Sequence, residues 1–578
     1  MIYTGVVYIK ITKNSQGQGY YHLVESHRVN GKPKQRTLLS LGKVGEDRLE
    51  ELLSAISRHK EVFGILDLAK SISVKDTFIF GPLLILEQMF ERFGIQELLD
   101  EMILKHPKLE LDLKQIIFTL VACRFIRPGS KLKVFEYWQK KLYPEMIAGK
   151  MELHQIYRAL DLLCEHKEEI EKSLYWHGRD LLNQQVDVVL YDLTTLRFES
   201  VREDLGKLRR FGYSKEMRTD CTQVILGLLV NPEGIPLGFE VYPGNTFEGK
   251  TLRDIVQKMR NKFDVRRFIF VADRGLFSEK NLEEIRSHCG EKAENAGEFI
   301  VGMKLGIFPK RHAEFYDRSK FKSICESLEI YETTHEGDRC IITWSKSRYE
   351  RDQKVREDIL QKIRKKLSTK TVDAKSFVSN KNYKKYLKGL STGEIELDDT
   401  VIEEESKKDG FFGIITNAKN FSAQDIVRYY KHLWIIEDAF GEIKGTLKAR
   451  PIFHWSDNRI VGHLTLCFLS YFCEAQITKI LREKNVLLQS QAMDQEIIDP
   501  RALTFVEVLK ELCEIRAIPV QVRGKTIWVR NDINGNAAKL FLALGLKIPP
   551  RLLKFEQNEE NVVAQNNSVS VTHCKINT

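Results

Sequence analysis

Two short apolar segments that each end in an aspartate most restrict the fold of this 578-residue chain. Segment 186–192 is rich in valine and ends in Asp192. Segment 267–273 has the same form, ends in Asp273, and is followed closely by Gly275, which permits a sharp turn. Short apolar runs are typical of buried strands, so we expect a strand to deliver each aspartate at its tip. One strand-end aspartate is usually a turn former or helix cap, whereas two favour a shared site.

A third acid, Glu437, lies in a segment with a helical pattern. Tyr430, Glu437 and Lys444 are seven residues apart, so on one helix all three project from roughly the same face. Ser422 followed by Asp425 predicts the start of this helix, because the spacing is typical of a capping box. Taken alone, such a stripe is usually a solvated face. The two strand-borne aspartates favour a functional role for Glu437.

Three acids from three elements suit phosphoryl transfer if they converge. Hard divalent cations take oxygen ligands, and Mg²⁺ in particular binds a few carboxylates together with substrate phosphate. Two such ions about 3.5–4 Å apart activate the attacking oxygen and stabilise the leaving one. We therefore expect Asp192, Asp273 and Glu437 to bind metal.

The order of elements supports this convergence. From residue 186 to residue 303, the patterns predict the order β-β-β-α-β-α-β. A further helix carries Glu437. This is the α/β layout of a ribonuclease H-like domain. The predicted elements are 186–192, 222–230, 235–242, 251–263, 267–273, 278–288 and 299–303.

Motifs around the acids resemble those of the DDE-type transposases of bacterial insertion sequences, in the branch with a Tyr-Arg-Glu-Lys signature. Tyr430, Glu437 and Lys444 match the signature, and the two aspartates match the family's first two acids. Further similar motifs occur in the family's order over roughly residues 180–470. They are 212–215, 234–238, 243–246 and 450–454.

The resemblance implies a cut-and-paste enzyme that cleaves DNA at the terminal inverted repeats of its element and joins the freed 3′-hydroxyl to target DNA. It implies that Asp192, Asp273 and Glu437 are the catalytic residues and hold two Mg²⁺ or Mn²⁺ ions. Tyr430 and Lys444 would position DNA phosphates. Joining two ends implies at least a dimer in the synaptic complex.

The chain departs from the signature at Leu433, where the family carries arginine. A leucine side chain cannot contact a phosphate. We expect Arg450 or Lys431 to supply the missing positive charge.

The interval between the second and third acids predicts an insertion. Asp273 and Glu437 are 164 residues apart, whereas Asp192 and Asp273 are only 81 apart. Loops of that length without structure of their own are uncommon, so we place an insertion domain at 305–415. It contains a strand-like stretch, 340–344, and a charged helix-like stretch from 349 to 367. The resemblance implies a mainly β insertion.

The charge balance is compatible with a polyanionic partner. There are 90 basic and 80 acidic residues, a net charge of +10. Basic residues also cluster just after the first acid. Such runs are more often solvated, but these could follow a phosphate backbone, and we single out Arg210 and Lys215. The cluster is Lys207, Arg209, Arg210, Lys215 and Arg218.

The cysteines and apolar segments predict a cytosolic protein. The ten cysteines sit singly, and no cysteine or histidine cluster has zinc-ligand spacing, so a structural zinc site is not expected. Residues 1–10 lack the pattern of a secretion signal. The apolar stretch 460–473 is too short and too polar to span a membrane, so we interpret it as a core helix behind the catalytic one. We expect no membrane association and a place in the bacterial cytosol near the nucleoid.

The flanks are less specific. A small antiparallel β domain is expected at 1–47, and a helical region at 48–180 that either binds the DNA ends or is a plain bundle. The catalytic core would comprise 181–304 and 416–480. A mixed α/β appendix is expected at 481–555, with a disordered tail at 556–578.

Two other function classes remain open from the residues alone. One is a nuclease that uses the same acids without strand joining, and the other is a decayed protein that binds DNA without cutting it. The terminal repeat, the target preference and the excision route cannot be deduced from this chain.

Overall fold

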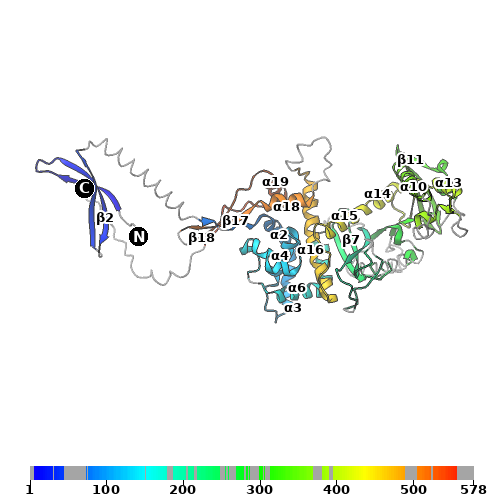
Figure 1. The fold of residues 1–578 in the computed structure, drawn as a ribbon, viewed down its shortest axis with the longest axis horizontal. Coiled ribbons are helices and arrows are strands. Elements are labelled where there is room, and N and C mark those ends of the chain that lie inside the picture. Colours follow the sequence, from blue (N-terminus) through cyan, green and yellow to red (C-terminus); the bar gives the residue numbers. More distant parts are fainter. Residues whose placement is uncertain are drawn as a thin grey trace. The chain divides into compact units, whose positions relative to one another are not determined.

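The described residues of the computed structural model form two compact units (Figure 1). One unit takes in Met1–Thr77, Ala517–Asn531 and Pro550–Thr578, and the other takes in Phe78–Arg516 and Asp532–Pro549. The structure describes residues 6–29, 32–43, 73–74, 76–149, 151–178, 187–203, 206–213, 218–247, 251, 254–255, 258, 268–276, 278, 281–283, 286, 298–303, 305, 313–368, 381–388, 395–487, 504–522 and 525–555.

The first unit contains two antiparallel sheets. β1 (Val6–Lys13), β2 (Gly19–Val29) and β3 (Lys32–Gly42) pair in chain order, as their alternating pattern predicts. A second sheet has the order β19-β18-β17-β4. Its strands are β4 (Ser73–Val74), β17 (Arg516–Val522), β18 (Lys525–Arg530) and β19 (Leu552–Phe555).

The second unit is built on a mixed sheet whose centre has the predicted order of elements. β6 (Asp187–Arg197) lies between β7 (Gln223–Val230) and β9 (Phe268–Ala272), antiparallel to β7 and parallel to β9. β8 (Pro236–Pro243) forms a hairpin with β7, and β10 (Glu298–Met303) runs parallel to β9. Much of the two predicted intervening helices, 251–263 and 278–288, falls outside the described residues.

The sheet continues beyond β10 through strands from the beginning and the end of the insertion. β16 (Phe411–Thr416) pairs antiparallel with β10 on one side and with β13 (Asp338–Ser345) on the other. β12 (Leu328–His335) and β11 (Lys322–Cys325) complete this edge. The predicted strand 340–344 is therefore part of the central sheet and does not belong to a separate layer.

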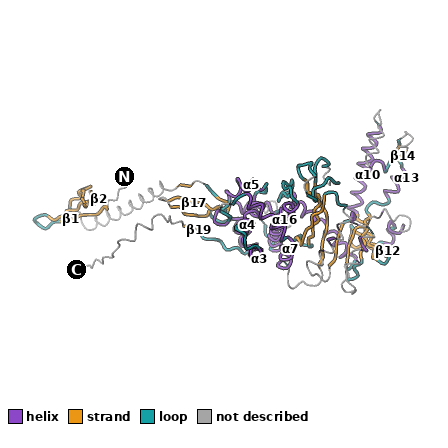
Figure 2. Tube along the Cα trace, turned by 90° about the horizontal axis from the view of Figure 1, so that it is seen from below, coloured by secondary structure: helices purple, strands orange, loops and turns teal. Residues whose placement is uncertain are grey.

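The rest of the insertion is more helical than expected. α10 (Lys346–Leu367) confirms the predicted charged helix, and α12 (Lys381–Lys384) and α13 (Asp399–Ser406) follow. β14 (Leu387–Lys388) and β15 (Glu396–Leu397) make only a short ribbon. A mainly β insertion is thus not confirmed, because the stretch of α10 is rich in strong helix formers and lacks glycine and proline. α10 contacts β13 and α12, and α10 and α13 lie near each other at the insertion end of the sheet (Figures 1 and 2).

Helices dominate the described residues of the second unit that precede β6. One of them, α7, begins at a buried ion-pair cluster beside the sheet: Lys167 contacts Glu171 of the same helix and Glu240 of β8, each at 3.1 Å. The helices are α2 (Gly81–Arg92), α3 (Ile95–Lys105), α4 (Leu113–Ile126), α5 (Lys131–Glu136), α6 (Leu153–Glu165) and α7 (Lys167–His177).

The long helix α16 (Asp457–Glu483) lies between these helices and the central sheet (Figure 1). It packs on α4 and α6 on one side and on β8 and α15 (Leu433–Lys444) on the other. It is longer than the predicted stretch 460–473. By length and composition α16 alone among the described helices could cross a membrane, but most of it is buried inside the protein, which agrees with a core helix. α18 (Phe505–Cys513) and α19 (Gly535–Leu544) follow it in the chain.

One core residue of α16 gives the fold a predictable pH dependence. Glu474 is 2% exposed, and its burial, together with the nearby Glu442, raises the pKa of its carboxyl group well above the ordinary value. A raised folded-state pKa means that stability is full below the unfolded-state pKa and is lost as the pH rises toward the folded-state pKa.

We expect Glu474→Gln to remove this loss. As the pH rises from about 5 to about 8, the free energy of unfolding of the parent should fall relative to that of the variant, by up to about 1.4 kcal/mol per pH unit. Denaturant unfolding at a series of pH values measures the difference. Glu483→Gln, at the exposed end of the same helix, is the control and should show no such trend. A pH-independent difference for Glu474→Gln would show that this carboxyl group stays ionised when buried.

Candidate active site

The register between β6 and β9 brings the two aspartates together. Tyr191 of β6 pairs with Ala272 of β9 in a parallel arrangement. Asp192 and Asp273 are the residues that directly follow this pair, so they lie next to each other. Asp192 is half-buried and Asp273 is exposed. Asp192 does not end its strand as predicted, because β6 continues to Arg197 by pairing with β7. It lies where β9 stops.

Glu437 approaches from α15, which packs on β6. The predicted single helix is in fact two, α14 (Ala423–Lys431) and α15, separated by a turn at His432. Ser422 caps α14 as expected: its hydroxyl accepts from the Asp425 N–H at 3.1 Å. Tyr430 therefore lies on α14, and Glu437 and Lys444 lie on α15. Glu437 is exposed, whereas Ile436, Ala439, Phe440 and Ile443 of the same helix are buried.

All three acids line one cavity of about 880 Å³. Its wall is formed by β6, the turn after β9, α14, α15 and the first turns of α10. Four basic side chains share this wall with aromatic rings. The basic residues are Arg274, Arg348, Arg351 and Lys431, and the aromatic ones are Phe412, Tyr430 and Trp434.

Tyr430 is tied directly to the second acid. Its hydroxyl donates to Asp273 Oδ1 at 2.9 Å. Burial, and then the charge of Asp273, raises the pKa of Tyr430, so the phenol stays protonated and remains a donor. Gly302 on β10 makes the contact sterically feasible, because a Cβ there would lie 2.5 Å from the Tyr430 hydroxyl.

Lys444 lies close to the first acid but outside the cavity wall. Its ammonium group donates a hydrogen bond to Thr194 Oγ1. Thr194 is two residues beyond Asp192 on β6, so their side chains share one face of the strand. The structure thus holds the amine of Lys444 beside the strand that carries Asp192.

Of the two cations considered as replacements for the missing arginine, Lys431 lies at the acids and Arg450 does not. Leu433 and Lys431 both line the cavity. Arg450 instead lines another cavity, of about 690 Å³, with Arg124 and Lys131, and burial and then the charge of Arg197 lower its pKa. Arg450 is therefore badly placed to replace the missing signature arginine at the acids.

Sequence reasoning missed the two arginines that α10 supplies. The Arg348 guanidinium lies 4.6 Å from the centre of the Phe412 ring, which itself packs 4.9 Å from the Tyr430 ring. Burial lowers the pKa of Arg348, and Asp352 lies 3.6 Å away. Arg351 is largely exposed. The charged pattern of this helix was visible, but nothing local indicated that its first turns face the acids.

The basic cluster after Asp192 does not supply Arg210 to the acid cavity. Arg210 donates to the carbonyls of Glu203, Arg209 and Gly206, at 2.9, 2.6 and 3.2 Å, and so organises its own loop. It does not line the acid cavity, which makes a structural role the simpler interpretation. Lys215 lies outside the described residues.

Comparison with known protein families agrees with this geometry. Residues 184–473, half of the chain, match the family described as the transposase DDE domain. Residues 9–64 match the N-terminal domain of the IS1634 family of transposases. No curated protein matches the chain. The matched DDE domain implies a ribonuclease H-like α/β fold, spans all three acids, and is found in enzymes that use divalent metal ions to cleave and join DNA strands. The chain therefore belongs to the DDE transposases of insertion sequences.

Proposed function

We propose that this transposase moves its own insertion sequence by a cut-and-paste route, with Asp192, Asp273 and Glu437 as its catalytic residues. The observation that carries the proposal is their arrangement: three carboxylates from three separate elements line one cavity. They would act on the terminal inverted repeats and then on target DNA.

The three side chains fit a site for hard divalent cations. They offer only carboxylate oxygens, which Mg²⁺ and Mn²⁺ prefer, and none of them is fully buried. We propose two ions of Mg²⁺ or Mn²⁺. Bound there, the ions would lower the charge barrier for the attacking 3′-oxygen or water and for the leaving oxygen.

The residues around the acids would fix their orientation. Tyr430 donates to one oxygen of Asp273, which restrains the rotation of that carboxylate. Lys444, through Thr194, holds α15 against the strand that carries Asp192. This supports assignment to the Tyr-Arg-Glu-Lys branch, with Tyr430 and Lys444 next to the metal ligands and in reach of DNA phosphates.

DNA would enter along the basic side of the cavity. Arg274, Arg348, Arg351 and Lys431 give four cations in a wall that also exposes the ring of Trp434 by 46%. Cations attract the phosphate backbone, and an exposed ring can stack on an unpaired base. We propose that the arginines of α10 replace the cation lost at Leu433.

The other parts of the chain would serve recognition and assembly. We propose that 1–47 and the helical region 48–180 contact the element ends, that 181–304 and 416–480 form the catalytic core, and that 305–415 covers the DNA there. The roles of the appendix, 481–555, and of the tail, 556–578, are not assigned. Two copies would pair the two ends in a synaptic complex in the bacterial cytosol.

Replacing each acid by its amide tests the assignment. Asp192→Asn, Asp273→Asn and Glu437→Gln should each lower metal-dependent cleavage of end-bearing DNA by about two orders of magnitude or more, because each removes a ligand charge worth several kcal/mol in the transition state. Gel assays with Mg²⁺ separate joined, cut and merely bound DNA, and affinity for the DNA should change little.

Asp438→Asn is the matched control, since Asp438 is the next residue on α15 but lines a different cavity. It should retain both cleavage and joining. An active amide variant of any of the three acids would remove that residue from the catalytic set. Cut DNA without joined product in the parent would favour a nuclease.

Arg351→Ala tests the α10 cations. We expect the affinity for end-bearing DNA to fall about tenfold, and the slope of log affinity against log salt to decrease by about one, because one phosphate contact is lost. Fluorescence anisotropy at several salt concentrations measures both. Lys354→Ala, on an exposed position further along α10 and away from the cavity, is the control. An unchanged slope for Arg351→Ala would place its guanidinium away from the DNA.

A further inference from the structure

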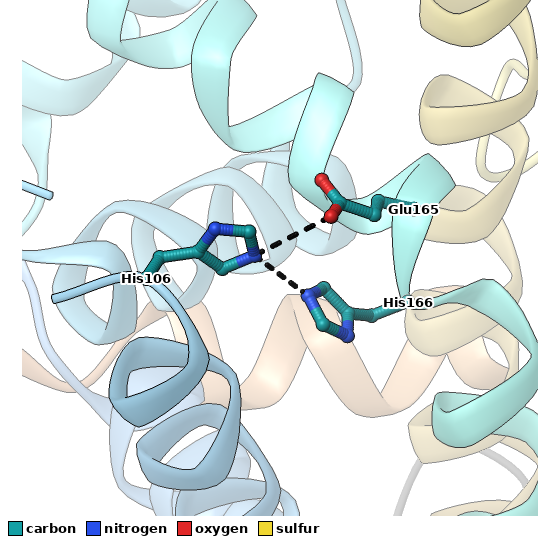
Figure 3. Close-up of side chains that lie close together, drawn as sticks. All are labelled: His106, Glu165 and His166. Carbon is teal, nitrogen blue, oxygen red and sulfur yellow. Dashed lines mark hydrogen bonds and ion pairs between the residues drawn. The ribbon is translucent and has the colours of Figure 1, made fainter. Parts of the chain in front are cut away.

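Two histidines and a glutamate meet in the helical region, far along the chain from the catalytic acids. His106 follows the end of α3, Glu165 ends α6, and His166 lies between α6 and α7. Their side chains point toward one another (Figure 3). His106 Nε2 lies 2.9 Å from His166 Nε2 and 3.7 Å from Glu165 Oε1.

A neighbouring carboxylate fixes the orientation of one ring. His166 Nδ1 lies 3.0 Å from Glu169 Oε2, and Lys105 donates to the same oxygen at 2.7 Å. Because Glu169 accepts the hydrogen bond from Lys105, its carboxylate also faces His166 as an acceptor. His166 therefore donates through Nδ1, and the Nε2 of the neutral ring carries a lone pair directed at His106.

The spacing of the three atoms suits a small divalent ion. Zinc binds imidazole nitrogen at about 2.0–2.1 Å in tetrahedral geometry, which places two ligand atoms about 3.3 Å apart. The observed 2.9 and 3.7 Å lie on either side of this value. The third pair, His166 and Glu165, also lies within 4.8 Å. A change of about 0.4 Å in each of the two distances to His106, with the third pair adjusting by side-chain motion at the helix ends, would admit an ion.

We propose that His106, Glu165 and His166 form a zinc site. Two imidazole nitrogens and one carboxylate oxygen are a zinc ligand set, and Glu165 is exposed enough for water to complete the tetrahedron. Glu169, behind His166, supplies the carboxylate–histidine pair that typically orients a zinc ligand. The ion would join the end of α3 to the junction of α6 and α7.

The simpler alternative is a direct hydrogen bond between two neutral histidines. In it His106 Nε2 carries the proton, whereas in the zinc site the same nitrogen is a ligand and the proton moves to Nδ1. Sequence spacing gave no sign of a metal site, because His106 and Glu165 are 59 residues apart. The site does not depend on the catalytic proposal.

Calorimetric titration of the full chain with Zn²⁺ tests the inference. Excess Mg²⁺ should be present throughout, because it occupies the all-carboxylate cavity yet competes poorly for imidazole. We expect one zinc ion per chain at this site and a rise in melting temperature on zinc addition. His106→Gln should abolish this binding event, and Glu169→Gln should weaken it about 10–100-fold.

Two further variants guard against loss of folding. Glu165→Gln changes an exposed side chain and should still weaken zinc binding, whereas Glu168→Gln, an exposed acid three residues away, should not. Circular dichroism checks that each variant is folded. Absence of stoichiometric zinc binding in the parent, or equal binding by the parent and a folded His106→Gln variant, would overturn the proposal and leave a histidine–histidine hydrogen bond.

Discussion

The parallel pairing of β6 with β9 is the constraint on which the site depends. Val189, Leu190, Phe270 and Val271 have no exposed surface, so the hydrophobic burial of both strands fixes their register. A slip by one residue would turn each aspartate to the opposite face of the sheet. Since the register is held by the core, Asp192 stays beside Asp273.

The third acid depends on how the long insertion returns to the sheet. β16 pairs with β10, which is the neighbour of β9, and α14 begins soon after β16. The chain therefore returns to the sheet one strand away from β9. The contact of Tyr430 with Asp273 then anchors α14, and the packing of α15 on β6 turns Glu437 toward the same cavity. An insertion of any length is compatible with this site as long as β16 keeps its place.

The insertion also changes the electrostatics of the site. Three carboxylates in one cavity repel one another and a DNA phosphate, and cations nearby offset this cost. Leu433 cannot contribute, but α10 brings Arg348 and Arg351 to the wall, and Arg348 is held in place by the Phe412 ring. The positive charge in this wall thus comes partly from a helix some 80 residues before Leu433 in the chain.

The sequence by itself determined the local elements, the three acids and the order that brings them together, because strand and helix periodicity and short motifs depend on neighbouring residues. It could not show that β6 runs past Asp192, that the helical segment with Tyr430 and Glu437 breaks at His432, or that His106 meets Glu165 and His166. β6 runs past Asp192 because it pairs with β7, and the helix breaks because α14 and α15 pack on different strands. The three side chains meet because the ends of their helices lie together. Such contacts join residues distant in sequence, so only the tertiary structure could decide them.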